Sequence, residues 1–76
     1  MIKELTELEY GQEGVIHSIG ENIKPKLCGM GIRDGKVIRM DTKQPIQGPV
    51  VVTVDKSTTS LGFGLAKKIF IEVKKQ

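Results

Sequence analysis

His17 and Cys28 are the only histidine and the only cysteine in this chain of 76 residues, and both side chains can bind soft or borderline metal ions. No i,i+4 spacing joins them, and neither has a second residue of its type. Glu21 or Asp34 could supply carboxylates, but nothing in the spacing selects them. Because a lone cysteine is more often a small buried hydrophobe, the ligand count predicts neither a metal site nor a cofactor.

A catalytic site is also not indicated. Nucleophilic catalysis needs a nucleophile, a base and an orienting group within hydrogen-bonding reach of one another. One histidine, one cysteine and scattered carboxylates do not provide such a set on neighbouring segments. We therefore predict that the chain is not an enzyme.

Three glycines lie in the segment KLCGMGIRDG, residues 26–35, and this density is typical either of a phosphate-binding loop or of a backbone turn. A dinucleotide-binding loop needs GxGxxG directly after a strand and at the start of a helix. These glycines have a different spacing, and no Gly-Lys-Ser/Thr of a Walker motif occurs. The segment is therefore predicted to end a helix, not to bind a nucleotide.

A short helix over residues 25–30 explains the glycines. Pro25 suits the first turn because its φ is preset and no amide donor is needed there. Gly31 then lies just past the end, in the left-handed conformation that glycine tolerates. Leu27 and Ile32 occupy the two positions whose apolar contact accompanies a Schellman motif.

Length and composition predict a single cytoplasmic domain over residues 1–76, with a mass of 8.4 kDa. One cysteine cannot form an intramolecular disulfide, which favours a reducing compartment. The sequence shows no secretory signal, and no apolar run approaches the ~20 residues that span a bilayer.

The formal net charge of +3 is unevenly distributed, since residues 1–21 hold five Glu and one Lys. A basic remainder suits an acidic partner or a transient contact with a membrane surface, although solvated lysines on outer strand faces explain most of it. Tyr10, Phe63 and Phe70 are too few and too scattered for a stacking platform, so nucleic-acid binding is disfavoured.

The apolar composition favours strands, with nine Ile and seven Val against five Leu and one Ala. β-branched side chains suit a pleated sheet better than a helix. Alternate residues of a strand share a face, which groups Val50, Val52 and Val54. The predicted strands cover residues 15–19, 36–42, 49–55 and 69–73, with Leu5 and Leu8 on one face of a turn, a tight turn at 34–35, and a short return at 57–60 whose hydroxyls face solvent.

Short antiparallel strands joined by tight turns usually curl into a small barrel, because closure removes unpaired edges. We expect a mainly β fold: an SH3-like barrel of five strands with one or two short helices. The oligonucleotide-binding fold is the nearest rival.

The segment LGFGLAKKI, residues 61–69, predicts a second short helical turn with a start loosened by Gly62 and Gly64. Phe63 is expected in the core, because most aromatic side chains are buried. If it is exposed instead, an aromatic ring beside Lys67 and Lys68 would make a contact for a partner.

The order of apolar residues and glycines along this chain resembles that of the ferrous iron transport protein A (FeoA) family. The most specific element is Leu-x-x-Met-Gly-Ile-x-x-Gly at residues 27–35, and the match runs from residue 5 to about residue 73. Asp34 stands where the family often has Pro, and residues 62–64 replace larger polar residues. The other matching positions are Leu5, Leu8, Gly11, Gly14, Ile16, Ile19, Gly48, Pro49, Val50, Leu61, Ala66 and Ile69.

The resemblance implies an SH3-like domain that is a cytosolic accessory of FeoB, the membrane ferrous iron transporter with a GTP-binding domain. We expect a non-enzymatic adaptor that binds and modulates this transporter through a surface including Phe63, Lys67 and Lys68. The family is also described as binding transition metals, and similar domains form the C-terminal part of metal-dependent repressors. The alternative is therefore a metal-sensing module whose weak site involves His17 or Cys28.

Overall fold

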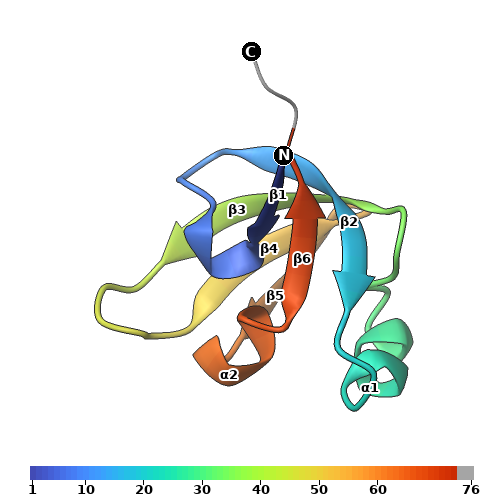
Figure 1. Ribbon diagram of the computed structural model, residues 1–76. Helices are drawn as coiled ribbons and strands as arrows, with labels where there is room; N and C mark the ends of the chain where they lie inside the picture. Colours follow the sequence, from blue (N-terminus) through green and yellow to red (C-terminus); the bar gives the residue numbers. More distant parts are fainter. Residues whose placement is uncertain (74–76) are drawn as a thin grey trace.

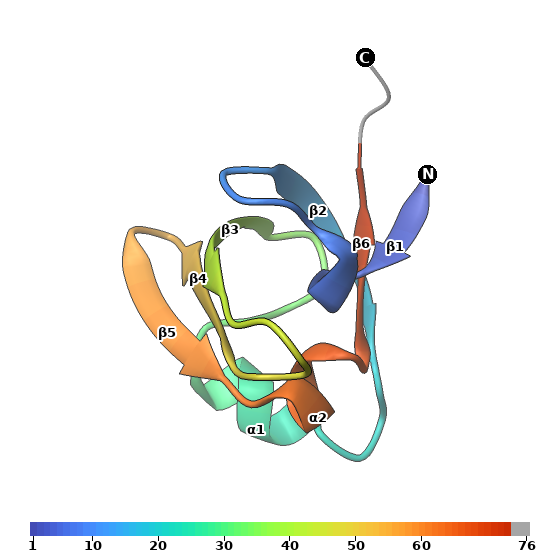
Figure 2. The ribbon, with the colours of Figure 1, turned by 90° about the vertical axis from the view of Figure 1, so that its left-hand side faces the viewer.

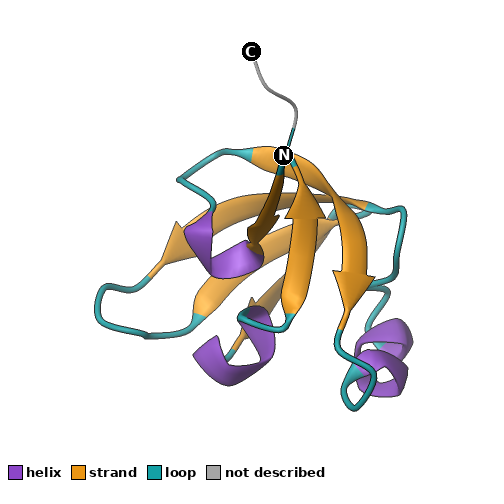
Figure 3. Ribbon diagram, in the orientation of Figure 1, coloured by secondary structure: helices purple, strands orange, loops and turns teal. Residues whose placement is uncertain are grey.

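Six antiparallel strands form one curved sheet in the order β1-β6-β2-β3-β4-β5 (Figures 1 and 2). The computed structural model describes residues 1–73. Two short helices follow β2 and β5 and lie at the same end of the sheet (Figure 3). The elements are β1 Ile2–Glu4, the 3-10 helix η1 Leu5–Glu7, β2 Glu13–Ile19, α1 Lys24–Gly29, β3 Val37–Lys43, β4 Val50–Val54, β5 Ser57–Leu61, α2 Phe63–Ala66 and β6 Ile69–Glu72.

The mainly β prediction is confirmed, but the sheet has six strands where the sequence predicts five. Residues 57–60, predicted as a short return, belong to the strand β5, which pairs with β4 in a continuous register. The chain reverses at Asp55 and Lys56, whose φ angles are 51° and 67°. Such turns usually carry glycine at the second position. With Lys56 there instead, the hairpin turn cannot be recognised from the sequence. The predicted exposure of the hydroxyls holds for Ser57, Thr58 and Ser60.

Alternation along the strands builds the core. Val50, Val52 and Val54 are buried on one face of β4, as the period of two predicts. The same rule is confirmed at β6, where Ile69 and Ile71 point inward. Among residues 1–73, the buried core residues are Leu5, Leu8, Ile16, Ile19, Leu27, Ile32, Ile38, Met40, Val50, Val52, Val54, Leu61, Ala66, Ile69, Ile71 and Val73.

The end of α1 is the predicted Schellman motif. Gly31 has a φ of 85°, and its N–H donates to the Cys28 carbonyl at 3.0 Å. The Ile32 N–H donates to the Leu27 carbonyl at 2.9 Å, and both of these side chains are fully buried. Carbonyls at the helix end are thereby satisfied while an apolar contact joins α1 to the core.

β2 and β6 lie close together at Gly14. A Cβ atom at this position would overlap Ile71 Cγ2 and would lie 2.8 Å from the Glu72 carbonyl oxygen. Val15 and Ile16, the next residues of β2, pair with Glu72 and Ile71 of β6. The absence of a side chain at residue 14 therefore permits β2 to pair with β6.

Gly14→Ala should lower the free energy of unfolding by about 1–3 kcal/mol, because the added methyl group must displace the β6 backbone. Urea denaturation followed by circular dichroism measures this change. Gly29→Ala is the matched control, because a Cβ at Gly29 meets no atom within 4 Å and the residue is helical. The control should keep or raise the stability, and an equal loss in both variants would contradict the steric explanation.

Candidate partner-binding surface

α2 places the three predicted partner-binding residues on one short turn after β5. The Gly62 carbonyl accepts hydrogen bonds from the N–H groups of Leu65 and Ala66 at 3.1 and 3.0 Å. Ala66 is fully buried, and Leu65 packs against the core cluster. This inward side of the turn anchors it, so that Lys67 and Lys68 follow on the exposed side.

The prediction that Phe63 belongs to the core is wrong. Its side chain is half-buried and lies outside the core cluster. The reason is its position as the first residue of α2, where Leu65 and Ala66 take the places facing the sheet. An aromatic ring that remains accessible beside two lysines fits the alternative of a partner contact.

The end of α2 is held by a second segment. The N–H of Gly20, which follows β2, donates to the Lys68 carbonyl at 3.0 Å. A Cβ at Gly20 would lie 3.4 Å from the Lys68 Cβ, so the two backbones pass closely. The Lys68 backbone is therefore fixed while its ammonium group extends into solvent.

Lys67 and Lys68 make no ion pair with any residue among 1–73. Other lysines of the described chain are paired: Lys24 with Asp34 at 3.3 Å and Lys36 with Asp55 at 2.8 Å. An unpaired ammonium group has no internal partner to lose when it meets a carboxylate of another protein. The α2 surface, defined here as Phe63, Lys67 and Lys68, thus combines apolar area with two available positive charges.

The two candidate metal ligands are placed on different elements. His17 lies on β2, is exposed, and has its Nδ1 atom 3.3 Å from the Ser18 hydroxyl. Cys28 lies on α1 and is half-buried. No group of three or more His, Cys, Asp or Glu side chains that could hold a metal ion occurs within residues 1–73.

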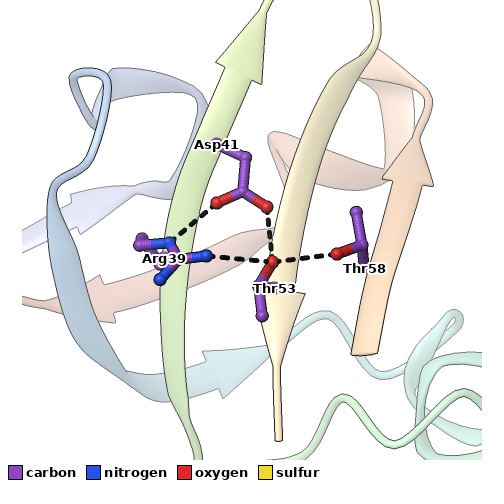
Figure 4. Close-up of polar contacts among 4 residues, drawn as sticks. All are labelled: Arg39, Asp41, Thr53 and Thr58. Atoms are coloured by element: carbon purple, nitrogen blue, oxygen red, sulfur yellow. Dashed lines mark hydrogen bonds and ion pairs between the residues drawn. The ribbon is translucent and has the colours of Figure 1, made fainter. Parts of the chain in front are cut away.

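A polar ladder crosses the outer face of β3, β4 and β5 (Figure 4). It consists of Arg39, Asp41, Thr53 and Thr58. Arg39 Nε donates to Asp41 Oδ1 at 2.8 Å, and the Thr53 hydroxyl donates to Asp41 Oδ2. Thr53 Oγ1 also lies 3.5 Å from Arg39 Nη2 and 3.2 Å from Thr58 Oγ1.

The ladder shifts the pKa of both charged members. The hydroxyl of Thr53 and the guanidinium of Arg39 lower the pKa of Asp41, because both donate hydrogen bonds to the carboxylate. The Asp41 carboxylate in turn raises the pKa of Arg39.

The sequence analysis did not identify these residues. Their signal is alternation, since Arg39 and Asp41 flank the buried Met40 and must face outward.

The curved sheet of six antiparallel strands with two short helices belongs to the SH3-like class of folds. The family model of the FeoA domain matches residues 3–73, so the chain belongs to the FeoA family. The predicted family and the predicted SH3-like fold are confirmed. No curated protein matches the chain.

Solved structures agree with this assignment. An iron uptake regulatory protein (FeoA) is 29% identical, with a TM-score of 0.85, and the match covers 95% of this chain and 96% of that protein. Stenotrophomonas maltophilia FeoA, solved in complex with zinc and described as a prokaryotic SH3 domain protein, is 27% identical, with a TM-score of 0.76 and coverage of 90% and 87%.

A manganese-dependent transcriptional repressor in complex with manganese has a TM-score of 0.88. It is 19% identical, and the match covers 96% of this chain but 37% of the repressor. This likeness shows a shared fold within a longer protein.

The lowered pKa of Asp41 predicts how stability depends on pH. The ordinary pKa of an aspartate is 3.8, and the pKa of Asp41 in the folded protein is lower. The ladder therefore adds to the free energy of unfolding at pH values above the ordinary pKa, and this stabilisation is lost as the pH falls through the folded pKa. Asp41→Asn should therefore have a lower free energy of unfolding than wild type at neutral pH. On acidification, its free energy of unfolding should fall by less than that of wild type. Urea denaturation at neutral and acidic pH measures this, with Glu21→Gln as the control. Equal acid sensitivity in wild type and Asp41→Asn would contradict the assignment.

Proposed function

We propose that this chain is a cytoplasmic accessory protein of ferrous iron uptake that binds and modulates a FeoB-like membrane transporter. Membership of the FeoA family supports the connection with ferrous iron transport. Within residues 1–73 no helix is long and apolar enough to cross a membrane. A role in transport would then be exerted through contact with a membrane protein.

The observation that carries the proposal is the unpaired charge on the α2 surface. Lys67 and Lys68 are exposed on a backbone that hydrogen bonds fix at both ends. Phe63 adds accessible aromatic area to the same turn. A matching partner surface would present carboxylates around an apolar patch, because electrostatic complementarity steers association and a buried aromatic side chain adds affinity.

A metal-sensing module is the second candidate. The similarity in fold to a manganese-dependent repressor and the zinc complex of a related FeoA favour it. A site built from this chain would start from His17 or Cys28, and a complete ligand set would need residues of a second molecule or the partner. If His17→Ala/Cys28→Ala leaves metal affinity unchanged, this candidate is removed.

The double variant Lys67→Glu/Lys68→Glu tests the adaptor proposal. Titration of the isotope-labelled protein with the cytosolic GTP-binding domain of the transporter, followed by amide NMR shifts, measures affinity at low and moderate salt. We expect wild-type shifts to cluster at residues 61–68. The double variant should bind about tenfold more weakly and with a smaller dependence on salt, since both effects come from the same two charges.

Lys3→Glu/Lys56→Glu is the matched control for the change of four charge units. Neither residue makes an ion pair within residues 1–73, and both lie outside α2. If the control weakens binding as much as the α2 variant, net charge and not the α2 surface drives association. Unchanged affinity in the α2 variant would place the docking surface elsewhere.

A further inference from the structure

The two edges of the sheet are protected very differently. β1 is three residues long and carries Lys3 and Glu4. β5 has five residues, Ser57–Leu61, with no charge, proline or bulge. Charges, proline, bulges and short length are the devices by which natural sheets prevent pairing at an edge. β5 has none of these, and its free side forms one flank of the molecule in Figure 2.

The register of the β4–β5 hairpin shows which backbone groups of β5 are free. Val54 pairs with Ser57 across a loop of two residues, so these two residues exchange both of their hydrogen bonds. Hydrogen-bonded and non-hydrogen-bonded pairs then alternate along the strands. The N–H and C=O groups of Thr58 and Ser60 therefore point away from β4. They have no backbone partner among residues 1–73.

The polar ladder ends at the same edge. The Thr53 hydroxyl donates its single hydrogen to Asp41, so it must accept from Thr58. The lone pairs of Thr58 Oγ1 then remain for a donor beyond the edge. A strand docking here can place a hydroxyl or another donor opposite Thr58.

We propose that β5 is a self-association edge, on which a second copy of this chain adds its own β5 antiparallel about a two-fold axis. In the register that uses every free group, Thr58 pairs with the partner subunit's Ser60, and Thr59 lies on the axis opposite the partner subunit's Thr59. Both Thr58–Ser60 pairs exchange two backbone hydrogen bonds. The hydroxyl of the partner subunit's Ser60 can then donate a hydrogen bond to Thr58 Oγ1.

Several properties favour a second copy of this chain as the source of the strand that pairs with β5. The strand carries no charge, so two copies meet without repulsion along the strand. Thr–Thr and Thr–Ser neighbours stabilise adjacent strands, and this register provides both kinds. A register centred on Thr58 would pair Ser60 with the partner subunit's Lys56, whose positive φ removes it from the extended conformation. A contact of one strand is small, so we expect a reversible dimer that forms at high concentration.

The first test measures the mass of the full chain by sedimentation from micromolar to millimolar concentration, together with amide NMR spectra. The expected result is a rise toward the dimer mass, with saturable shifts centred on residues 58–60. Ser60→Pro removes one free N–H without touching the β4 ladder and should weaken the dimer about tenfold or more. Ser60→Ala keeps that N–H and should change the dimer constant less.

The second test determines the register of the two β5 strands and does not use the Ser60→Pro variant. In a Cys28→Ser background, Thr59→Cys places two thiols opposite each other at a Cα separation of ~4.5 Å, which suits a disulfide. Thr58→Cys is the matched control, because its thiol faces the partner subunit's Ser60. Rapid oxidation of the Thr59→Cys protein to a covalent dimer, with slow oxidation of the control, supports the proposal.

Two results would overturn it: a monomer mass at millimolar concentration, or equal oxidation rates for the two cysteine variants. Association with shifts at residues 61–68 and none at 58–60 would also overturn it, since the interface would then be α2. A protein that gains mass only with a different partner strand present would show that β5 binds another chain and not its own copy.

Discussion

The close packing of β6 against β2 is the contact on which the rest of the structure depends. Gly14 leaves room for the β6 backbone, and Ile16 and Ile71 then pair in the core. β6 carries β1 on its other side, and the chain enters β6 directly from α2. The position of the α2 surface is therefore a consequence of how β6 is seated. A substitution at residue 14 would therefore alter the α2 surface, although residue 14 does not contact it.

Local patterns in the sequence predict the parts of the fold that depend on few residues. The Schellman motif needs Gly31 and two apolar residues, and β4 needs an alternation of valines. β5 was harder to predict, because its turn uses Asp55 and Lys56 at positive φ without glycine. Alternation around Met40 places Arg39 and Asp41 on the outer face, but their contacts with Thr53 and Thr58 depend on the register of β3, β4 and β5 and could not be predicted from spacing.

The outcome for Phe63 shows why site residues are harder to predict than elements. Composition favours burial of an aromatic side chain, but a helix of four residues has room for few inward positions, and Leu65 and Ala66 fill them. Lys67 and Lys68 are exposed, as charged side chains on a short turn usually are. Whether they bind a partner depends on a second surface, which is not encoded in this chain.

The interior location of β6 also affects how the protein can be made. It is the last strand in sequence among residues 1–73, yet it lies between β1 and β2 in the sheet. Ile2 pairs with Glu72, so this contact joins residues separated by nearly the entire described chain. Such distant pairing slows folding. A folding chain in which the β2–β5 hairpins have formed without β6 leaves their apolar face open. The protein therefore exposes a hydrophobic surface, which chaperones can bind, until the last described strand has paired.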